Sequence, residues 1–317
     1  MRYDFLHNHK DFPNLIQIVA DEYAINPVLI EKDYWIMHCL YGLQQLGLNF
    51  ELKGGTSLSK GFGIIDRFSE DIDIRIEPPT TMGVKTNPNQ QKPAQVETRE
   101  SFYDWLASMI KISGINGVER DTEFDDKRYY RSGGIRLQYD GTTGTISGLK
   151  NGILLEVGFD DVSPNSPQMI SSWVYGYAAD KVAIIDNRAI DVACYHPGYT
   201  FVEKLQTIST KFRRQQEDGN FPANFMRHYY DVYQLLNEPE VCAFIGTKEY
   251  AAHKAKRFSN ADNPILAKNE AFLLNDPDTR QFYAKAYAQS HALYYKNQPS
   301  FDDIMAAIVN AVQMNGI

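Results

Sequence analysis

The sequence predicts an α+β protein, in which a part that mixes strands with helices is followed by an all-helical part. Segments with strand periodicity alternate with helical segments through the first two thirds of the chain. From Thr200 onward the apolar pattern is helical, and the helix-breaking run His196-Pro197-Gly198 separates the two parts. We therefore expect two domains, residues 1–196 with the sheet and the N-terminal helices, and residues 197–317 with helices alone.

The N-terminal segment from Phe12 to Gly47 has helical spacing, and Pro27 marks the first turn of a second helix within it. We expect a short strand over 50–52, then a glycine turn, and the first turn of a helix over 57–62. Residues 67–77 alternate polar and apolar side chains, which predicts a strand with one buried face.

Residues 78–97 are rich in Pro, Asn, Gln and Thr, which predicts a long loop, either a functional lid or a mobile segment. A helix is expected over 101–112. Ile135, Leu137 and Tyr139 alternate with polar residues, and residues 152–159 are expected to return beside them as an antiparallel hairpin.

The C-terminal part shows an apolar stripe through Phe201, Leu205, Ile208 and Phe212, which predicts its first helix. Further helices are expected over 224–236, 248–257, 279–295 and 301–312.

The composition is that of an ordinary globular protein, with 317 residues of which 43% are apolar and 23% charged. The net charge of −8 argues against a protein that coats nucleic acid without specificity, although a local basic groove stays compatible with it. Three scattered cysteines indicate a reducing, cytoplasmic setting. The sequence shows no apolar run long enough to cross a membrane and no signal-peptide pattern, so we expect no membrane partner.

The chemistry is concentrated in Lys53–Lys60 and in the strand that follows. Asp71 and Asp73 are two residues apart in a strand, so both carboxylates lie on one face. Oxygen ligands of this kind suit Mg²⁺, with Mn²⁺ as the alternative metal. The turn Gly54-Gly55-Thr56-Ser57 offers backbone N–H groups and hydroxyls to a triphosphate. A solvated strand face is the alternative, but aspartate is disfavoured in strands and adjacent carboxylates repel each other.

Glu156 is the expected third metal ligand or general base, because it interrupts the apolar strand Ile153–Val157. A buried glutamate has to be paired, metal-bound or protonated. The alternatives are an ion pair between Glu156 and Arg136 across the hairpin, and Asp160 as the third carboxylate instead.

In the helical part, Lys204 lies beside the apolar stripe, where its ammonium reaches either solvent or a phosphate. Arg227 and Asp231 share a helix face, and a surface ion pair between them is the simplest explanation. Two basic clusters, Lys127-Arg128 with Arg131 around Tyr129, and Lys211 with Arg213 and Arg214, suit either unpaired nucleotides or solvent.

Taken together, these residues resemble the AbiEii/AbiGii-type nucleotidyltransferase toxins of the polymerase-β-like superfamily. The resemblance rests on Gly54–Lys60 followed by Arg67-x-Ser69-x-Asp71-x-Asp73. It also includes Glu31-Lys32-Asp33-Tyr34, Glu203-Lys204-Leu205, Arg227-His228-x-x-Asp231, His253-Lys254 and Phe301-Asp302-x-Ile304. One position departs from the family, because His228 stands where an aspartate is usual.

The resemblance implies a mixed-sheet nucleotidyltransferase domain, a helical partner domain and Mg²⁺ on Asp71 and Asp73. It implies that Ser57 and Lys204 contact the nucleotide phosphates and that Asp231 belongs to the active site. From the same motifs we assign Gly54, Gly55, Thr56, Lys60, Arg67, Ser69 and Arg227 to nucleotide binding. Family members act as toxins paired with an antitoxin, and some attach nucleotides to the acceptor ends of tRNA.

The expected activity is transfer of a nucleotidyl group from an NTP to RNA. Transfer to a small molecule is one alternative, and a non-catalytic nucleotide-binding module is another.

Overall fold

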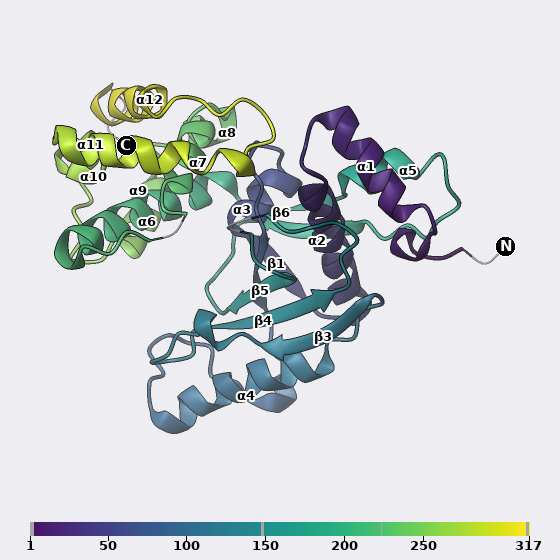
Figure 1. Cartoon of the computed structure of the whole chain (residues 1–317). Coiled ribbons are helices and arrows are strands. Elements are labelled where there is room, and N and C mark those ends of the chain that lie inside the picture. The colour runs from purple at the N-terminus through teal and green to yellow at the C-terminus, as the bar shows by residue number, and fades with distance from the viewer. Residues whose placement is uncertain (1–2, 147–148, 223, 315–316) are drawn as a thin grey trace. The chain divides into compact units, whose positions relative to one another are not determined.

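The computed structural model describes residues 3–146, 149–222, 224–314 and 317 (Figure 1). They form two compact units, of which the first comprises Met1–Phe62 and Ser69–Tyr195 and the second comprises Gly63–Phe68 and His196–Ile317. The predicted α+β class is confirmed. The division into domains at residue 196 stays a proposal, and the structure adds that residues 63–68 group with the helical unit.

The first unit is built on a seven-stranded mixed sheet with the strand order β3-β4-β5-β2-β1-β7-β6. Strand β2 pairs in parallel with β5 and antiparallel with β1, while β1 pairs in parallel with β7. The other neighbours are antiparallel. The strands are β1 (Phe50–Lys53), β2 (Asp71–Ile76), β3 (Ile115–Arg120), β4 (Ser132–Tyr139), β5 (Ile153–Gly158), β6 (Asn165–Ile170) and β7 (Ala189–Tyr195).

Helices α2 and α4 pack against one face of this sheet, where β2 contributes Ile72, Ile74 and Ile76 to a core without solvent exposure. The ring of Tyr103 in α4 lies against Gly133 of β4, and Figure 1 shows α4 alongside β3 and β4. The helical segments of the unit are η1 (Leu6–Asn8), α1 (Phe12–Tyr23), α2 (Pro27–Gln45), α3 (Gly54–Thr56), η2 (Ser57–Gly61), η3 (Thr80–Met82), α4 (Pro93–Met109), η4 (Thr122–Phe124) and α5 (Trp173–Ala178).

The second unit is helical and buries a core rich in aromatic rings. Its long helix α6 begins after His196, whose ring accepts a hydrogen bond from the Gly198 N–H, and ends before Gly219 at φ +73°. Its helical segments are α6 (Pro197–Asp218), α7 (Arg227–Leu235), α8 (Pro239–Phe244), α9 (Lys248–Arg257), η5 (Leu266–Lys268), α10 (Glu270–Leu273), α11 (Pro277–Ala288), η6 (His291–Leu293) and α12 (Phe301–Met314). Within the ranges that the structure describes, no helix has the length and apolar character that a bilayer crossing requires.

Several predicted boundaries were wrong. The aspartate strand begins at Asp71 instead of Arg67, because residues 63–68 belong to the other unit. The predicted loop 78–97 contains a short 3₁₀ turn, and α4 begins at Pro93, where the proline and the Lys92–Gln95 capping contacts start a helix that an apolar pattern alone does not reveal. The predicted helix over 279–295 ends at Ala288.

The predicted hairpin is confirmed, since β4 and β5 pair antiparallel with Ile135 opposite Leu155. Strands β3, β6 and β7 and helices α5, α8 and α10 were not predicted. Strand β6 includes Pro167 and lies at a sheet edge, so its sequence lacks a clear strand pattern.

Candidate active site

Strand β2 carries the two predicted aspartates at its start. Asp71 and Asp73 share the sheet face opposite the isoleucine core, as the period of two requires. The Asp71 side chain is 10% exposed, so its carboxylate lies largely out of water. The prediction that both carboxylates share one face is confirmed.

Glu156 reaches the same face through the parallel pairing of β2 with β5. The register places Asp73 beside Glu156 and Asp71 beside Leu154. Asp160 lies after the end of β5 and is exposed, so the strand pairing brings Glu156, and not Asp160, next to an aspartate.

Arg136, the predicted alternative partner of Glu156, interacts with other groups. Its Nε donates to Asp121 Oδ2 at 3.0 Å and its Nη1 to the Asn151 carbonyl at 3.3 Å. The register of β4 with β5 sets Gly134 opposite Glu156. The role of Glu156 as a metal ligand or general base stays a prediction.

The predicted glycine turn lies directly beside the aspartate strand. Gly54 has φ +73°, and a Cβ there would lie 2.1 Å from Asp73 Oδ2, so the Asp73 carboxylate occupies the space that only glycine leaves. Thr56 Oγ1 donates to the Asp71 carbonyl at 2.5 Å, which ties the turn to the strand. Gly55 and Thr56 are buried, and the following residues form a π-helical turn, Ser57–Gly61.

Ser57 is fully buried beneath this turn. Within the described residues its Oγ has no nitrogen or oxygen partner, and it lies beside the Cys194 thiol. Burial raises the pKa of that thiol to about 11, an effect that the Ser57 hydroxyl partly offsets. A phosphate contact of Ser57 stays a proposal, as does that of Ser69, which is half-buried two residues before Asp71.

The carboxylate face suits a divalent cation in the chemistry of its donors, although the described residues include no cluster of three or more His, Cys, Asp or Glu side chains in metal-binding arrangement. A cationic side chain of the protein lies at Asp71, since Lys150 Nζ is 3.3 Å from both oxygens of the Asp71 carboxylate. Asp71, Asp73 and Glu156 carry oxygen donors of the kind that Mg²⁺ takes, and an ammonium group is held at Asp71.

The motif Glu31-Lys32-Asp33 lies in α2 with all three side chains buried, so each needs a partner. Asp33 accepts the Trp173 N–H at 2.8 Å and forms an ion pair with Lys60 Nζ at 2.7 Å. The ammonium of Lys60, predicted to bind the nucleotide, is therefore held by Asp33 and lies 4.9 Å from the centre of the Trp173 ring.

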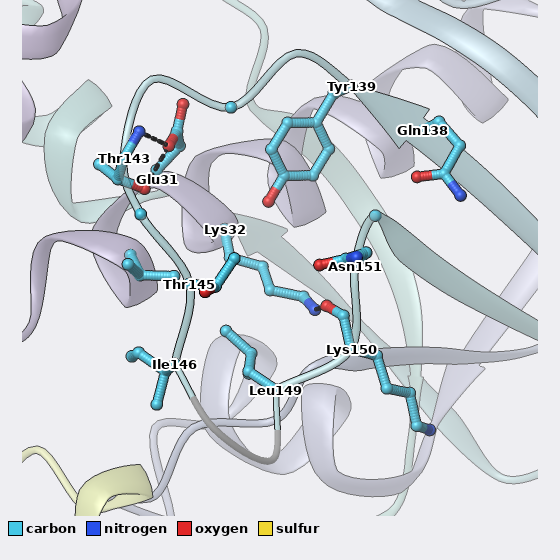
Figure 2. A pocket seen from close by; sticks show the side chains of 14 residues that line it. Glu31, Lys32, Gln138, Tyr139, Thr143, Thr145, Ile146, Leu149, Lys150 and Asn151 are labelled. Carbon is cyan, nitrogen blue, oxygen red and sulfur yellow. Dashed lines mark hydrogen bonds between the residues drawn. The ribbon is translucent and has the colours of Figure 1, made fainter.

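Next to these residues, α2 and residues from 141–146 and 149–152 line a cavity of about 320 Å³ (Figure 2). The Tyr139 ring, the Lys32 stem and the Asn151 amide form parts of its wall. Glu31 closes one end, because its carboxylate accepts the N–H groups and the hydroxyls of Thr142 and Thr143.

In the second unit, Asp231 forms a bidentate ion pair with Arg67. The guanidinium donates through Nε at 2.6 Å and Nη2 at 2.7 Å, and Lys204 Nζ lies 2.9 Å from Asp231 Oδ2. Burial would raise the pKa of Asp231, but Arg67 and then Lys204 outweigh it and hold that pKa well below its ordinary value. The predicted surface pair between Arg227 and Asp231 was wrong, because Asp231 has no solvent exposure and turns to Arg67.

His228 belongs to a cluster of positive charge around this ion pair. Burial, followed by Lys204, Lys211, Arg227 and Arg67, lowers its pKa well below the ordinary value, so the ring is neutral. Its Nε2 lies 3.0 Å from Lys211 Nζ and accepts from it. The cluster suits an anion such as a polyphosphate.

Comparisons with known proteins identify the family. The model of the AbiEii nucleotidyl transferase toxins of type IV toxin–antitoxin systems matches residues 36–307. This chain belongs to the AbiEii family. No curated protein matches it. Among solved structures it is similar to an antigenic nucleotidyltransferase-like protein from Paracoccidioides brasiliensis, with 12% identity, 86% of this chain and 97% of that chain covered, and a TM-score of 0.36.

Membership of the AbiEii family establishes that the chain is a nucleotidyltransferase of a toxin–antitoxin family. The family model spans the glycine turn, the aspartate strand, β5 and the Arg67–Asp231 ion pair. The residues that carry the resemblance therefore lie inside the matched segment, except for Glu31 to Tyr34, which precede it.

Sequence analysis missed Lys150 and the functions of Lys32 and Arg67 as partners of carboxylates. Nothing in the local pattern marks Lys150, which follows a polar, glycine-containing stretch. The sequence did contain a sign that Lys32 binds a carboxylate or another polar group. A lysine among apolar residues of a helix has to find a partner when that helix is buried.

Proposed function

We propose that this AbiEii-family enzyme transfers a nucleotidyl group from an NTP to the end of an RNA acceptor, with tRNA as the expected acceptor. The observation that carries the proposal is the pairing of β2 with β5, which sets Glu156 beside Asp73 on the face that also carries Asp71. The Gly54 turn lies against the Asp73 carboxylate.

Asp71, Asp73 and Glu156 would hold Mg²⁺, or Mn²⁺ in its place. When bound there, the metal supplies Lewis-acid stabilisation of the charge on the reacting oxygens. The carboxylates then serve as oxygen ligands, and Gly54 keeps the space that the Asp73 carboxylate needs.

In the proposed reaction, the acceptor hydroxyl oxygen forms a bond to the α-phosphorus of the NTP. The bond between the α-phosphorus and the bridging oxygen breaks, and pyrophosphate leaves with that electron pair. Glu156 accepts the proton of the hydroxyl. The N–H groups of the glycine turn, together with Ser57 and Ser69, would orient the phosphates.

Lys204 and Arg227 are proposed to neutralise the non-reacting phosphates. The cluster around His228 supports this, because four cationic side chains act on one buried ring. Arg67 and Asp231 would hold Lys204 in position, since Asp231 is an acceptor for both cations.

RNA is favoured over a small-molecule acceptor by the cluster of Arg128, Tyr129 and Arg131. Both guanidinium groups lie over the Tyr129 ring, at 4.8 and 4.7 Å from its centre, and both arginines are exposed. A cationic aromatic surface of this kind suits stacking on unpaired bases and contact with the RNA backbone. A cognate antitoxin and a cytoplasmic location complete the proposal.

The test is incubation of the purified protein with each α-labelled NTP, Mg²⁺ and total tRNA, followed by gel analysis of the RNA. We expect label in the RNA with wild type, and none with Asp71→Asn or Asp73→Asn when their circular dichroism is unchanged. Label that persists in both variants, or that enters only small molecules, would overturn the proposal.

A further inference from the structure

Lys150 is a cation of the carboxylate face that neither the sequence motifs nor the family assignment points to. Its Nζ lies 3.3 Å from Oδ1 and 3.3 Å from Oδ2 of Asp71 and 4.3 Å from the centre of the Phe124 ring. Its side chain is 32% exposed, so the ammonium has access to solvent on one side.

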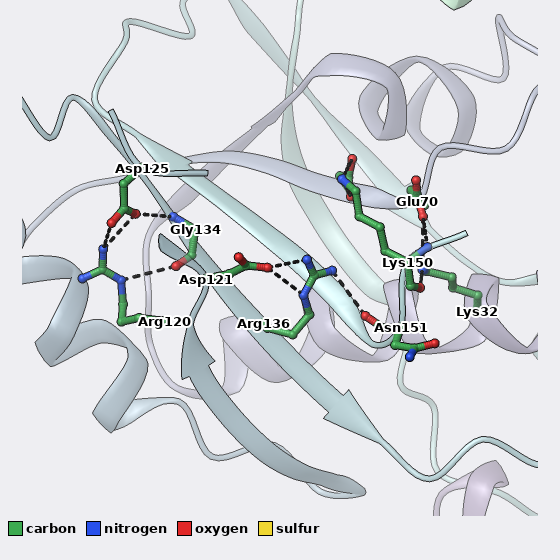
Figure 3. A network of polar contacts seen from close by, with 10 residues as sticks. Lys32, Glu70, Arg120, Asp121, Asp125, Gly134, Arg136, Lys150 and Asn151 are labelled. Atoms are coloured by element: carbon green, nitrogen blue, oxygen red, sulfur yellow. Dashed lines mark hydrogen bonds and ion pairs between the residues drawn. The ribbon is translucent and has the colours of Figure 1, made fainter. Parts of the chain in front are cut away.

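The backbone of Lys150 is held in place by a buried ion pair (Figure 3). Lys32 Nζ donates to the Lys150 carbonyl at 2.5 Å and lies 3.4 Å from Glu70 Oε2. The same Glu70 oxygen accepts the Lys150 N–H at 2.9 Å. Because Glu70 immediately precedes Asp71, this contact fixes Lys150 relative to the aspartate.

Helix α2 anchors the segment before Lys150 as well. Glu31, which adjoins Lys32, accepts the Thr142 N–H at 2.7 Å and the Thr143 N–H at 2.9 Å. Two consecutive residues of α2 thus hold both Thr142–Thr143 and the Lys150 backbone, which leaves the Lys150 side chain as the part that can change partner.

We propose that Lys150 competes with a divalent cation for Asp71, that the cation displaces its ammonium, and that the released ammonium binds a phosphate oxygen of the substrate. This inference rests on the proposed function, in which Asp71 holds the metal. Two cations at one carboxylate repel each other, so metal binding weakens the Lys150–Asp71 ion pair.

The released ammonium needs an anion, because it stays beside the site on a fixed backbone. A phosphate oxygen is the anion that both substrates offer, and lysine binds phosphate as a point charge. Lys32 acts on this exchange as a positioning residue, since it touches the Lys150 carbonyl and not the Asp71 carboxylate.

The experiment measures Mn²⁺ affinity by electron paramagnetic resonance, in wild type, Asp71→Asn, Lys150→Met and Lys111→Met. Lys111 is an exposed lysine of the same unit and serves as the matched control. We expect Lys150→Met to bind Mn²⁺ about two- to fivefold more tightly, the range of a partly exposed ion pair. Lys111→Met should match wild type, and Asp71→Asn should lose the site.

Steady-state transfer then tests the second half of the proposal. Lys150→Met should raise the KM for the NTP or the KM for RNA, which distinguishes a triphosphate partner from the RNA backbone, and Lys150→Arg should restore part of the loss. If neither KM changes, the phosphate contact is refuted.

The two proposals fail in different ways. Wild type that binds no Mn²⁺, or Asp71→Asn that binds it as well as wild type, refutes the metal site. Loss of binding in Asp71→Asn, with Lys150→Met at wild-type affinity or weaker, refutes only the displacement. Circular dichroism of each variant, and Lys150→Gln as a second substitution, exclude misfolding as the cause.

Discussion

The guanidinium of Arg67 and the carboxylate of Asp231 form a buried bidentate ion pair, although 164 positions separate them in the sequence. Their side chains are 3% and 0% exposed. Arg67 precedes the aspartate strand by only four residues, yet it belongs to the helical unit. This pair therefore ties the segment that leads into β2 to helix α7, within which Asp231 lies.

Asp231→Ala should destabilise the protein by about 3–5 kcal/mol, because it leaves the buried Arg67 and Lys204 without their shared carboxylate. Urea-induced unfolding measures this change. The exposed Asp278 provides the control, and Asp278→Ala should change the free energy of unfolding by about 0.5 kcal/mol or less. Equal stability of the two variants would contradict the structural role of Asp231.

Gly54→Ala should lower nucleotidyl transfer about a hundredfold, the effect of a displacement near 1 Å at a catalytic group. The added Cβ would lie 2.1 Å from Asp73 Oδ2 and force that carboxylate to move. Gly47→Ala separates this effect from backbone strain, because Gly47 has φ +71° and nothing within 4 Å of a Cβ. Both variants carry the cost of an alanine at positive φ, while Gly47→Ala keeps its transfer rate. Equal transfer rates in the two variants would contradict the prediction.

Lys60→Met should destabilise the protein by about 1–3 kcal/mol, because it leaves the buried Asp33 carboxylate without its ammonium partner. The double variant Lys60→Met/Asp33→Asn should be less destabilised than the sum of the two single variants. Thermal and urea unfolding give this coupling. An unchanged stability with a higher KM for the NTP would instead support the assignment of Lys60 to nucleotide binding.

Stability should fall between pH 6.5 and pH 4, because burial lowers the pKa of His38 to about 4. The unfolded chain takes up a proton on this ring near pH 6.5, whereas the folded chain does not until about pH 4. The stability that is complete above pH 6.5 therefore declines on acidification, by up to about 1.4 kcal/mol per pH unit. His7, whose ring lies 4.7 Å from that of His38, has its pKa lowered to about 4 for the same main reason.

His38→Gln tests this origin, since an amide N–H can replace the hydrogen bond from His38 Nε2 to the Ser113 carbonyl. Urea unfolding at a series of pH values should show a shallower decline for His38→Gln than for wild type. His291→Gln, at an exposed position, should keep the wild-type slope. A wild-type slope in His38→Gln would assign the decline to other groups.

Local patterns predicted the elements whose apolar spacing is regular. The stripe through Phe201 and Leu205 became α6, and the alternation at Ile135 and Leu137 became β4 in its predicted pairing with β5. Strand β6 escaped prediction because it lies at a sheet edge and includes a proline, and β7 because its pairing with β1 and β6, more than its side-chain pattern, defines it. Helix α4 began eight residues earlier than predicted, since a proline and a local cap start it.

Some features of the candidate site were likewise predictable from the sequence, and others were not. The common face of Asp71 and Asp73 follows from the strand period of two, so the sequence by itself determined it. The structure added that Gly54 leaves the space which the Asp73 carboxylate occupies. Which strand stands next to Asp73, and which cation meets Asp71, depends on pairing between segments about 80 residues apart. Only the tertiary structure decided that Glu156 joins the aspartates, that Lys150 neutralises Asp71 and that Asp231 binds Arg67 in place of Arg227. The physical reason is that side-chain periodicity reports which residues share a face of one element, whereas burial selects the charged partner from any part of the chain that packs against it.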